Sequence, residues 1–591
     1  MDLTPEDKAI GKENFYQAVG TTRRDFLLGT MGSTGLGLGA MYFGYDKIDK
    51  DDPVRIGVIG TGDEGSVLIG ALNPDYVDVV AIADIRPYNV WRAFHGDNYS
   101  PNAKKARPGL LEVYQDKYGW KDETEARDHV KVYEDSYEDL LADDNVEAVI
   151  IALPLWLHDV AAIKAMKAGK HVLTEKLMAQ TVGKCKEMAR VAAAEEKILA
   201  TGHQRHYSVL YANAVDTIKR GLIGDVHSIR AQWHRGNLPG RDSWQPSMPC
   251  EYVDEKKYGE MRRSARADGK EGGLRDQYKL LEQLHSMRRK AAVARKAKDT
   301  KLEEAWLTQA TQKEHQMMDR DVDAKKYDYQ DRTLDNGEGT QIPALEELIR
   351  WRLWNRTGAG LMAELGSHQL DAASIFISAQ SDTGGKVYPI SVIGSGSRSI
   401  FPYDRDVDDH VYTTFEFPAK GYYAEDGKTV ADPNKKIIVT YSSINGNGYG
   451  GYGEVVMGTK GTLILEKEKD VMLYKGSSTS TNIKVSQGKD GPQLDTTESG
   501  GGQEAAVAQA AMDISRGYRE EIEHWAWCIR NPGKGEVKCN PKVAMADAVI
   551  ALASNIAMKE NRRVEFKKEW FDINDNATPE DIPPRSIETL G

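Results

Sequence analysis

The sequence predicts an α/β protein in two parts: an N-terminal doubly wound parallel sheet and a C-terminal α+β domain with a mostly antiparallel, open sheet. Three observations predict this fold class. Near the start, short apolar strands alternate with helical patterns, as in βαβ units. A glycine-rich turn joins the first of these strands to the first of these helices. After residue 180, several strands alternate apolar and polar residues, which is typical of an antiparallel sheet with one exposed face.

The composition allows several globular domains and disfavours some partners. The chain has 591 residues and a net charge of −12, so non-specific binding to nucleic acid or to anionic lipid is not expected. The four cysteines show neither CxxC spacing nor a metal-binding pattern with histidine, so we expect no metal site. Two alternatives remain for Cys528 and Cys539: they form a disulfide in an oxidising compartment, or they are buried thiols.

The first unusual feature is TTRRDFLLGTMG, residues 21–32, in which a pair of arginines precedes a weakly apolar, glycine-rich run. Repeated glycines disfavour a stable helix, and the run is too short for a membrane span of about 20 apolar residues. The pattern predicts a twin-arginine export signal, with residues 1–52 as signal and linker. We therefore expect a periplasmic or otherwise exported protein that uses the Tat machinery. No cleavage site stands out after Gly39, so an uncleaved membrane tether stays an alternative.

Residues 54–72, VRIGVIGTGDEGSVLIGAL, contain a GxGxxG motif between a short apolar strand and a helix. Gly60 permits the tight turn, Gly62 lets the backbone approach a pyrophosphate, and Gly65 lets helix and strand pack closely. The N-terminus of the helix offers N–H groups and a positive dipole end to the phosphates. The motif therefore predicts a Rossmann-type dinucleotide-binding domain, to which we assign residues 53–176.

A second strand ends at Asp84, at about the separation from the glycine turn that a ribose-binding carboxylate requires. This carboxylate would repel a 2′-phosphate, so NAD is the expected cofactor. Arg86 is near enough to keep NADP as an alternative. Further βα units follow: an apolar strand over 147–153 is stopped by Pro154, and the next helix covers 158–168.

Two longer motifs carry a family resemblance. LPLWLHDVAAIKAMKAGKHVLTEKLMA (153–179) and GAGLMAELGSHQLD (358–371) resemble the glucose–fructose oxidoreductase and myo-inositol dehydrogenase family, also called Gfo/Idh/MocA. The resemblance extends from residue 53 to about 570, with one large insertion, and Tat-dependent export also occurs in this family. The sequence departs from the family pattern at Leu177, where a proline is usual, and at Glu364, where aspartate is usual.

The resemblance implies three catalytic residues. Lys176 would lie beside the nicotinamide and stabilise alkoxide character on a substrate hydroxyl. His368 would take the proton of that hydroxyl, since the usual pKa of histidine is near working pH. Glu364 is four residues before His368, so a helix would place both side chains on one face, where Glu364 orients the imidazole or binds a sugar hydroxyl.

The remaining predicted site residues divide into a cofactor-binding set and a substrate-binding set. For Gln204 and Arg205, packing between the domains is an equal alternative. For Asp371, the alternative is that it caps or supports its own helix. The predicted cofactor-binding residues are Gly60, Thr61, Gly62, Gly65, Asp84, Ile85, Arg86, Pro154, His158, Glu175, Lys176 and Gln204. The predicted substrate-binding residues are Arg205, Trp233, His234 and Asp371.

Residues 177–251 and 346–591 are predicted to form the second domain, for substrate binding and homo-oligomer formation. Residues 252–345 interrupt it with dense charge of both signs, which favours an insertion of mostly exposed polar helices. Whether the insertion is a lid or a partner surface is left open by the sequence. Residues 476–503 are rich in Gly, Ser and Thr and are expected to form a flexible loop.

Together these features predict an exported NAD(P)-dependent oxidoreductase that oxidises a secondary hydroxyl of a sugar, polyol or sugar derivative and keeps its cofactor tightly bound. Two alternatives remain. One is an NAD-dependent glycosidase of the same fold, which oxidises its substrate only transiently before elimination. The other is a non-catalytic protein that binds dinucleotide or sugar.

Overall fold

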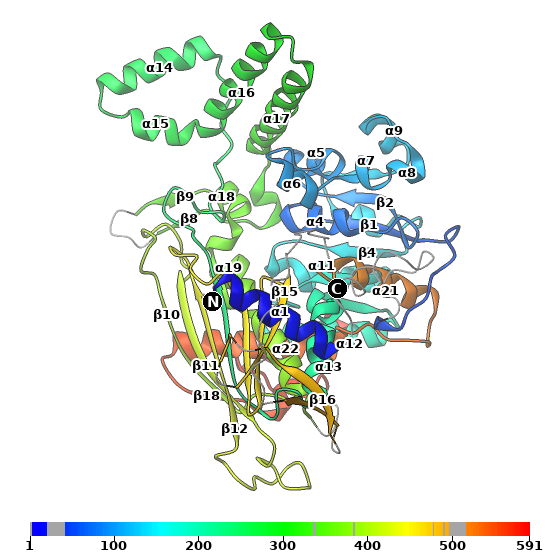
Figure 1. Cartoon of the computed structure of the whole chain (residues 1–591). Helices are drawn as coiled ribbons and strands as arrows, with labels where there is room; N and C mark the ends of the chain where they lie inside the picture. The colour runs from blue at the N-terminus through cyan, green and yellow to red at the C-terminus, as the bar shows by residue number, and fades with distance from the viewer. Residues whose placement is uncertain are drawn as a thin grey trace.

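The computed structural model describes residues 3–19, 42–334, 339–381, 385–476, 478–480, 482–488, 491–495 and 516–590. These residues form two large sheets with helices packed on them and two short strand pairs, and a helical arm projects from the body (Figure 1). The predicted fold class is confirmed. The predicted twin-arginine segment at 21–32 lies outside the described residues.

The N-terminal domain is built on six parallel strands in the order β3-β2-β1-β4-β5-β6. Successive strands are added on one side of β1 up to β3 and on the other side from β4 onward. In such sheets a crevice opens at the carboxyl ends of the strands where the order reverses, here β1 and β4. The last strand pairs Gly202 with Glu175 of β5, so the sheet extends past the boundary expected at residue 176. The strands are β1 (Val54–Ile59), β2 (Val77–Ala83), β3 (Lys131–Tyr133), β4 (Ala148–Ile151), β5 (His171–Glu175) and β6 (Leu199–Gly202).

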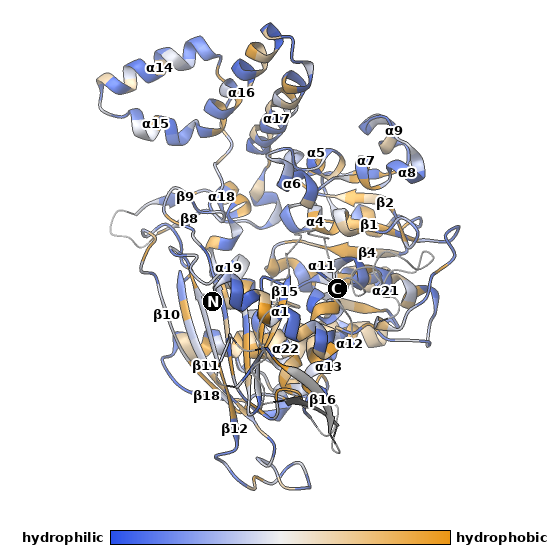
Figure 2. Cartoon of the chain, viewed as in Figure 1, coloured by the Kyte–Doolittle hydropathy of each residue, from blue (hydrophilic) through white to orange (hydrophobic). Residues whose placement is uncertain are grey.

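Helices cover both faces of this sheet, which explains why every residue of β2 is buried and apolar side chains fill its central strands (Figure 2). Most of these helices begin at a capping residue or a proline; Ser100, for example, accepts from the N–H of Ala103. The helices are α4 (Asp63–Ala71), α5 (Pro87–His95), α6 (Pro101–Ala106), α7 (Leu110–Val113), α8 (Gln115–Tyr118), α9 (Glu123–Arg127), α10 (Tyr137–Leu141), α11 (His158–Lys167) and α12 (Val182–Ala194).

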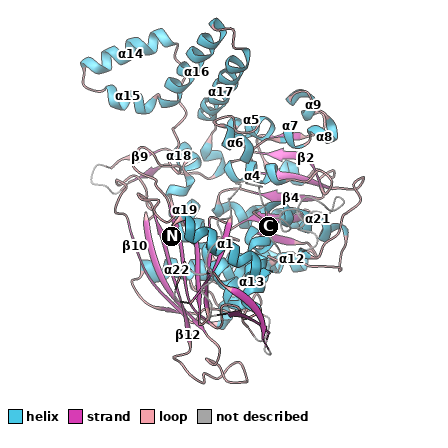
Figure 3. Cartoon of the chain, in the orientation of Figure 1, coloured by secondary structure: helices cyan, strands magenta, loops and turns pink. Residues whose placement is uncertain are grey.

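The second domain contains an eight-stranded sheet in the order β15-β14-β13-β7-β12-β11-β10-β18. Figure 3 shows its strands in magenta around β10 and β12. Its described pairs are antiparallel except for β12 with β7. Buried and more exposed residues alternate along β11 and β12, as the sequence pattern predicts. The strands are β7 (Val226–His234), β10 (Ser391–Ser397), β11 (His410–Pro418), β12 (Lys436–Ile444), β13 (Tyr452–Gly458), β14 (Gly461–Glu466), β15 (Asp470–Lys475) and β18 (Val564–Glu565).

Helices α20 and α22 pack on this sheet, against β7 and β10 respectively. In the described part of the chain, α22 is the helix long and apolar enough to cross a membrane, yet 72% of its apolar window is buried inside the protein, so it is a core helix. The helices of this domain are α13 (Val209–Lys219), α18 (Ala344–Ile349), α19 (Asn355–Gly358), α20 (Ser367–Ser378), α21 (Tyr518–Arg530) and α22 (Pro541–Lys559).

Three smaller features differ from the expectations or complete the fold. Residues 484–488 and 491–495, within the expected flexible loop, form a short hairpin of β16 and β17. A second short pair joins β8 (Arg332–Thr333) to β9 (Gln341–Ile342). All four cysteines are buried and free, so a Cys528–Cys539 disulfide is not formed.

The charged insertion forms a helical arm, defined here as residues 252–334. The arm contains the helices α14 (Glu255–Ala267), α15 (Glu271–Gln277), α16 (Lys279–Lys296) and α17 (Thr300–Met318) and the segment that follows them. The arm's surface is largely polar (Figure 2). Its first helices project away from both sheets, whereas α17 returns to pack against α5 of the N-terminal domain (Figure 1). One helix of the arm therefore reaches the dinucleotide-binding domain.

A helix that the sequence did not predict, α1 (Pro5–Val19), lies within the segment assigned to signal and linker. It packs on β15 through buried Phe15 and through Asn14, whose Nδ2 donates to the carbonyl of Leu473 at 2.9 Å. Lys8 pairs with Glu466 at 2.6 Å. Residues 5–19 thus belong to the folded body.

Candidate active site

A cavity of about 800 Å³ lies at the carboxyl edge of the parallel sheet. Its walls come from the ends of β1, β2, β4 and β5, from the second domain near β7 and α20, and from residues that follow α17. In a sheet of this topology, the crevice where strand order reverses is the place where ligands bind. The cavity therefore coincides with the predicted dinucleotide site.

The glycine turn fits a dinucleotide pyrophosphate. Gly60 has φ +86°, and a Cβ there would lie 2.7 Å from the carbonyl oxygen of Ala152. A Cβ on Gly65 would lie 2.1 Å from the carbonyl oxygen of Gly60, so only glycine allows this close packing. A Cβ on Gly62 would meet nothing nearer than 3.8 Å, so this backbone faces open space at the start of α4.

Asp84 is held at the end of β2 by donors from two sides. Its Oδ2 accepts from the N–H of Thr61 at 2.8 Å, and its Oδ1 accepts from the N–H of Arg86 at 2.9 Å. Asn89 Nδ2 donates to the same carboxylate at 3.1 Å. A carboxylate fixed beside the glycine turn is what recognition of the adenosine ribose requires.

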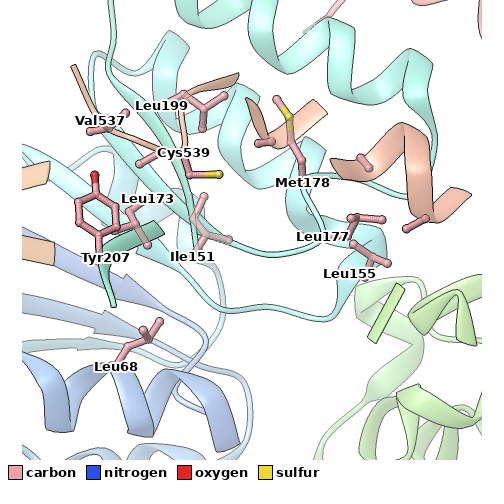
Figure 4. Packing of buried hydrophobic residues seen from close by; sticks show 14 of the residues in the cluster. Leu68, Ile151, Leu155, Leu173, Leu177, Met178, Leu199, Tyr207, Val537 and Cys539 are labelled. Atoms are coloured by element: carbon pink, nitrogen blue, oxygen red, sulfur yellow. The ribbon is translucent and has the colours of Figure 1, made fainter. Parts of the chain in front are cut away.

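The loop after β5 carries Lys176 into the cavity. The side chains of Leu177 and Met178 anchor this loop in the core, near Leu155 (Figure 4). His158 is buried beneath it, with Nδ1 2.8 Å from the carbonyl oxygen of Leu177 and Nε2 2.9 Å from that of Leu153. The Lys176–Leu177 peptide is cis, with leucine in place of the family's proline.

Lys176 and Glu364 meet at the domain junction. The Nζ of Lys176 donates to the carbonyl oxygen of Glu364 at 2.7 Å and lies 3.9 Å from its Oε2. Arg352 Nε donates to Glu364 Oε1 at 2.6 Å. Although burial raises the pKa of Glu364, the charges of Arg352 and Lys176 lower it to about 2. Glu364 is therefore a carboxylate that positions cations, and it is not a proton donor at working pH.

His368 lines the cavity one turn after Glu364. The backbone between them is a π-helical turn over Met362–Gly366 that leads into α20, where the sequence predicted a regular helix. Burial, followed by the charges of Lys176 and Arg205, lowers the pKa of His368 well below its usual value. The lowered pKa favours the neutral imidazole, which is the form in which a histidine accepts a proton.

An aromatic wall lies beside His368. The Trp233 ring stacks on Tyr452, with centroids 4.4 Å apart and planes at 13°, and it lies 5.5 Å from the His368 ring. Arg235 lies over the Trp233 ring at 5.5 Å. All four side chains line the cavity. A flat aromatic face next to charged donors suits the apolar face and the hydroxyls of a sugar ring.

Several predicted residues are not among those lining the cavity. Arg205 is buried and pairs with Glu468 at 2.5 Å. His234 is bound to Ser442 Oγ at 2.9 Å. For Gln204 and Arg205, the interdomain packing alternative agrees with their burial. The predicted residues that line it are Gly60, Gly62, Asp84, Ile85, Arg86, Pro154, His158, Glu175, Lys176, Trp233, Glu364 and His368; those that do not are Thr61, Gly65, Gln204, Arg205, His234 and Asp371.

Asp371 belongs to a buried cluster behind the site. His206 Nε2 lies 2.9 Å from Asp371 Oδ1, and Lys386 Nζ lies 3.7 Å from the same oxygen. Lys386 also pairs closely with Asp547. The ammonium group of Lys386 thus supplies a cation to these two carboxylates, and Asp371 supports α20 from behind instead of facing the cavity.

Sequence reasoning missed Arg352, Arg516, Tyr518 and the residues Lys326, Tyr327 and Tyr329 beyond α17. Arg352 stands in RWRLWNR, a cluster of arginine and tryptophan shortly before the acid–histidine motif, and this density was an available signal. The others come from elements with no motif of their own.

Comparison with known proteins supports the NAD-binding Rossmann domain. Residues 54–203 match the model of an oxidoreductase family with an NAD-binding Rossmann fold, Gfo/Idh/MocA. Inositol 2-dehydrogenase 1 of Saccharopolyspora erythraea is 29% identical over 202 residues, which is 33% of this chain and 50% of that protein. A glycosyl hydrolase family 109 protein of Solibacter usitatus is 28% identical over 214 residues, 35% of this chain and 44% of that protein.

Among solved structures, aldose–aldose oxidoreductase from Caulobacter crescentus, complexed with glycerol, has a TM-score of 0.46 and 15% identity, and the match covers 87% of this chain and 100% of that chain. The chain spans half or less of the length of the two curated relatives. Residues 54–203 are therefore similar to the NAD-binding Rossmann domain of the Gfo/Idh/MocA oxidoreductase family.

Proposed function

We propose that the protein is an exported NAD-dependent oxidoreductase that oxidises a secondary hydroxyl of a sugar, polyol or sugar derivative and retains its cofactor between turnovers. One observation carries the proposal: Lys176 and His368 line the same cavity as the glycine turn and Asp84. Oxidation of an alcohol by a dinucleotide needs a site for the pyrophosphate and ribose, and beside the nicotinamide it needs a cation and a neutral base. The cavity offers the first at one end and the second at the other.

The chain's own residues would act as follows. Trp233 and Arg235 orient the sugar ring, and the Lys176 ammonium hydrogen-bonds the reacting hydroxyl oxygen and stabilises negative charge on it. His368 accepts the proton of that hydroxyl as the carbon–oxygen double bond forms. A dinucleotide held by the glycine turn and Asp84 would supply the acceptor for the hydride that leaves the same carbon. Glu364, as a carboxylate, holds Lys176 and Arg352 in place.

Export and retention rest on the sequence and on the cavity. TTRRDFLL at 21–28 supports the twin-arginine route, which carries proteins that are already folded. Outside the inner membrane there is little free dinucleotide, so an enzyme working there must bring its cofactor along. Because a retained cofactor stays reduced after the hydroxyl is oxidised, a second substrate must accept the hydride before the next turnover. Walls from both domains and from the arm support retention, because release then requires several contacts to break together.

The glycosidase alternative is kept because one relative is named a family 109 glycosyl hydrolase. A panel of polyols, free sugars and aryl glycosides separates the two functions. The oxidoreductase proposal expects net reduction of bound nicotinamide, read by its absorbance, with a subset of polyols or sugars. Release of the aryl group without net reduction would favour the glycosidase, and no response to any compound would favour a binding protein.

A further inference from the structure

Arg86 is the cation that would favour NADP at a site whose carboxylate, Asp84, favours NAD. It lies two residues after Asp84, at the end of β2, and lines the cavity. In dinucleotide-binding domains an arginine near this carboxylate accommodates the 2′-phosphate of NADP. A dianionic phosphate needs such a cation to be available, since it loses its hydration on binding.

In this structure the guanidinium of Arg86 is already engaged by the arm. Its Nε lies 2.9 Å and its NH2 2.8 Å from Oδ2 of Asp319, immediately after α17. The other oxygen of Asp319 accepts from the N–H of Tyr88 at 3.0 Å. The Asp319 side chain is 1% exposed, so its carboxylate is enclosed against the edge of the N-terminal domain.

Packing fixes α17 where it meets α5. Gln312 Nε2 donates to Asp97 Oδ1 at 2.9 Å, and Gln312 Oε1 accepts from the N–H of Asn98 at 2.8 Å. The rings of Trp91 and His315 stack at 5.4 Å. Beyond α17, Tyr329 is buried in a small apolar cluster that also contacts Ile85. The arm is therefore anchored on both sides of Asp319.

The neighbouring cations are engaged as well. Arg92 pairs with Asp63 at 2.7 Å, and Lys326 pairs with Asp135 at 2.9 Å. Arg86, Arg92 and Lys326, which line the cavity near Asp84, are thus each paired with a carboxylate. A 2′-phosphate placed beside Arg86 would meet the charges of Asp84 and Asp319 instead of a free guanidinium.

We propose that Asp319, supplied by the inserted arm, is a specificity-determining residue that sets this site for NAD by occupying Arg86. The proposal rests on the use of the cavity as a dinucleotide site, but it does not depend on turnover or on the identity of the sugar. It also gives the arm a role: part of an insertion in the second domain completes the adenosine end of the site in the first.

The test is competitive loading of the full-length protein. Wild type, Asp319→Asn and Asp321→Asn are each unfolded to release bound dinucleotide and refolded with equimolar NAD and NADP. After desalting, the dinucleotides released by acid are quantified by mass spectrometry. Asparagine has the shape of aspartate, and its side-chain oxygen can still accept a hydrogen bond from the N–H of Tyr88. It carries no charge, so the guanidinium of Arg86 loses its anionic partner. Asp321 is an exposed neighbour paired with Arg320, so its variant is a matched control for charge.

We expect wild type and Asp321→Asn to hold NAD in large excess, and Asp319→Asn to raise the NADP-to-NAD ratio at least about tenfold, equivalent to about 1.4 kcal/mol. Arg86→Gln combined with Asp319→Asn should lose that gain. A folded Asp319→Asn with the wild-type ratio would overturn the proposal. Equal loading of wild type with both dinucleotides would also overturn it, even if the variant does not fold. Protein that holds neither dinucleotide would contradict the dinucleotide site itself.

Discussion

Replacing Lys176 with methionine removes the charge at the chemical end of the cavity and keeps most of the side-chain volume. The side chain is 9% exposed, and its Nζ is already placed by the carbonyl of Glu364 at 2.7 Å. A fixed donor to developing negative charge in an enclosed site is worth about 2.7–4 kcal/mol, so kcat should fall by about 10²–10³-fold. The dinucleotide content should not change, because the pyrophosphate and ribose contacts come from β1 and β2.

The assay measures two quantities on the same preparation: reduction of bound nicotinamide in a single turnover, and dinucleotide per chain after acid release. Lys167→Met is the matched control, since Lys167 is exposed near the end of α11 and its loss changes the net charge equally. A near-normal kcat in Lys176→Met would refute the catalytic assignment. Loss of the dinucleotide in this variant would show that Lys176 holds the cofactor instead.

The remaining predictions concern the proton and the export route. Because the proton acceptor must be neutral, and because burial and the charge of Lys176 lower the pKa of His368, the acidic limb of the kcat/KM profile should lie below the usual histidine value of 6.5, with activity lost as pH falls through it. His368→Asn should lower kcat by about 10²–10⁴-fold and remove that limb; an unchanged limb would assign the proton to another group. Arg23→Lys with Arg24→Lys should leave folded protein in the cytoplasm, as fractionation would show, and normal export of this variant would contradict the twin-arginine route.

The parts of the site that are local in sequence could be predicted. The glycine turn and Asp84 follow from a short strand, a tight turn and a helix, all within one βα unit. Lys176 and His368 were identified from two motifs, and their common cavity confirms that the motifs meet in space. Even there the π-helical turn at Met362–Gly366 was not predicted, because it depends on packing at the domain junction.

Other parts could not be predicted, because they depend on contacts between distant segments. Asp319 reaches Arg86 across 233 residues of sequence, and no motif marks it. Arg205 carries the right chemistry for a substrate ligand, yet Glu468 engages it in the interior. A sequence gives the type of such a residue but not the direction in which its side chain points. The same limit applies to α1. Its few apolar residues form no clear helical pattern, and the helix is held by its packing on β15.

The central claim is that this protein oxidises a sugar or polyol with a dinucleotide that it carries and does not exchange. The most direct measurement is made on exported wild-type protein after extensive dialysis, with no added NAD. The account predicts close to one dinucleotide per chain and its reduction in a single turnover when the substrate is added. Exported protein that is empty and needs fresh NAD for every turnover would contradict it.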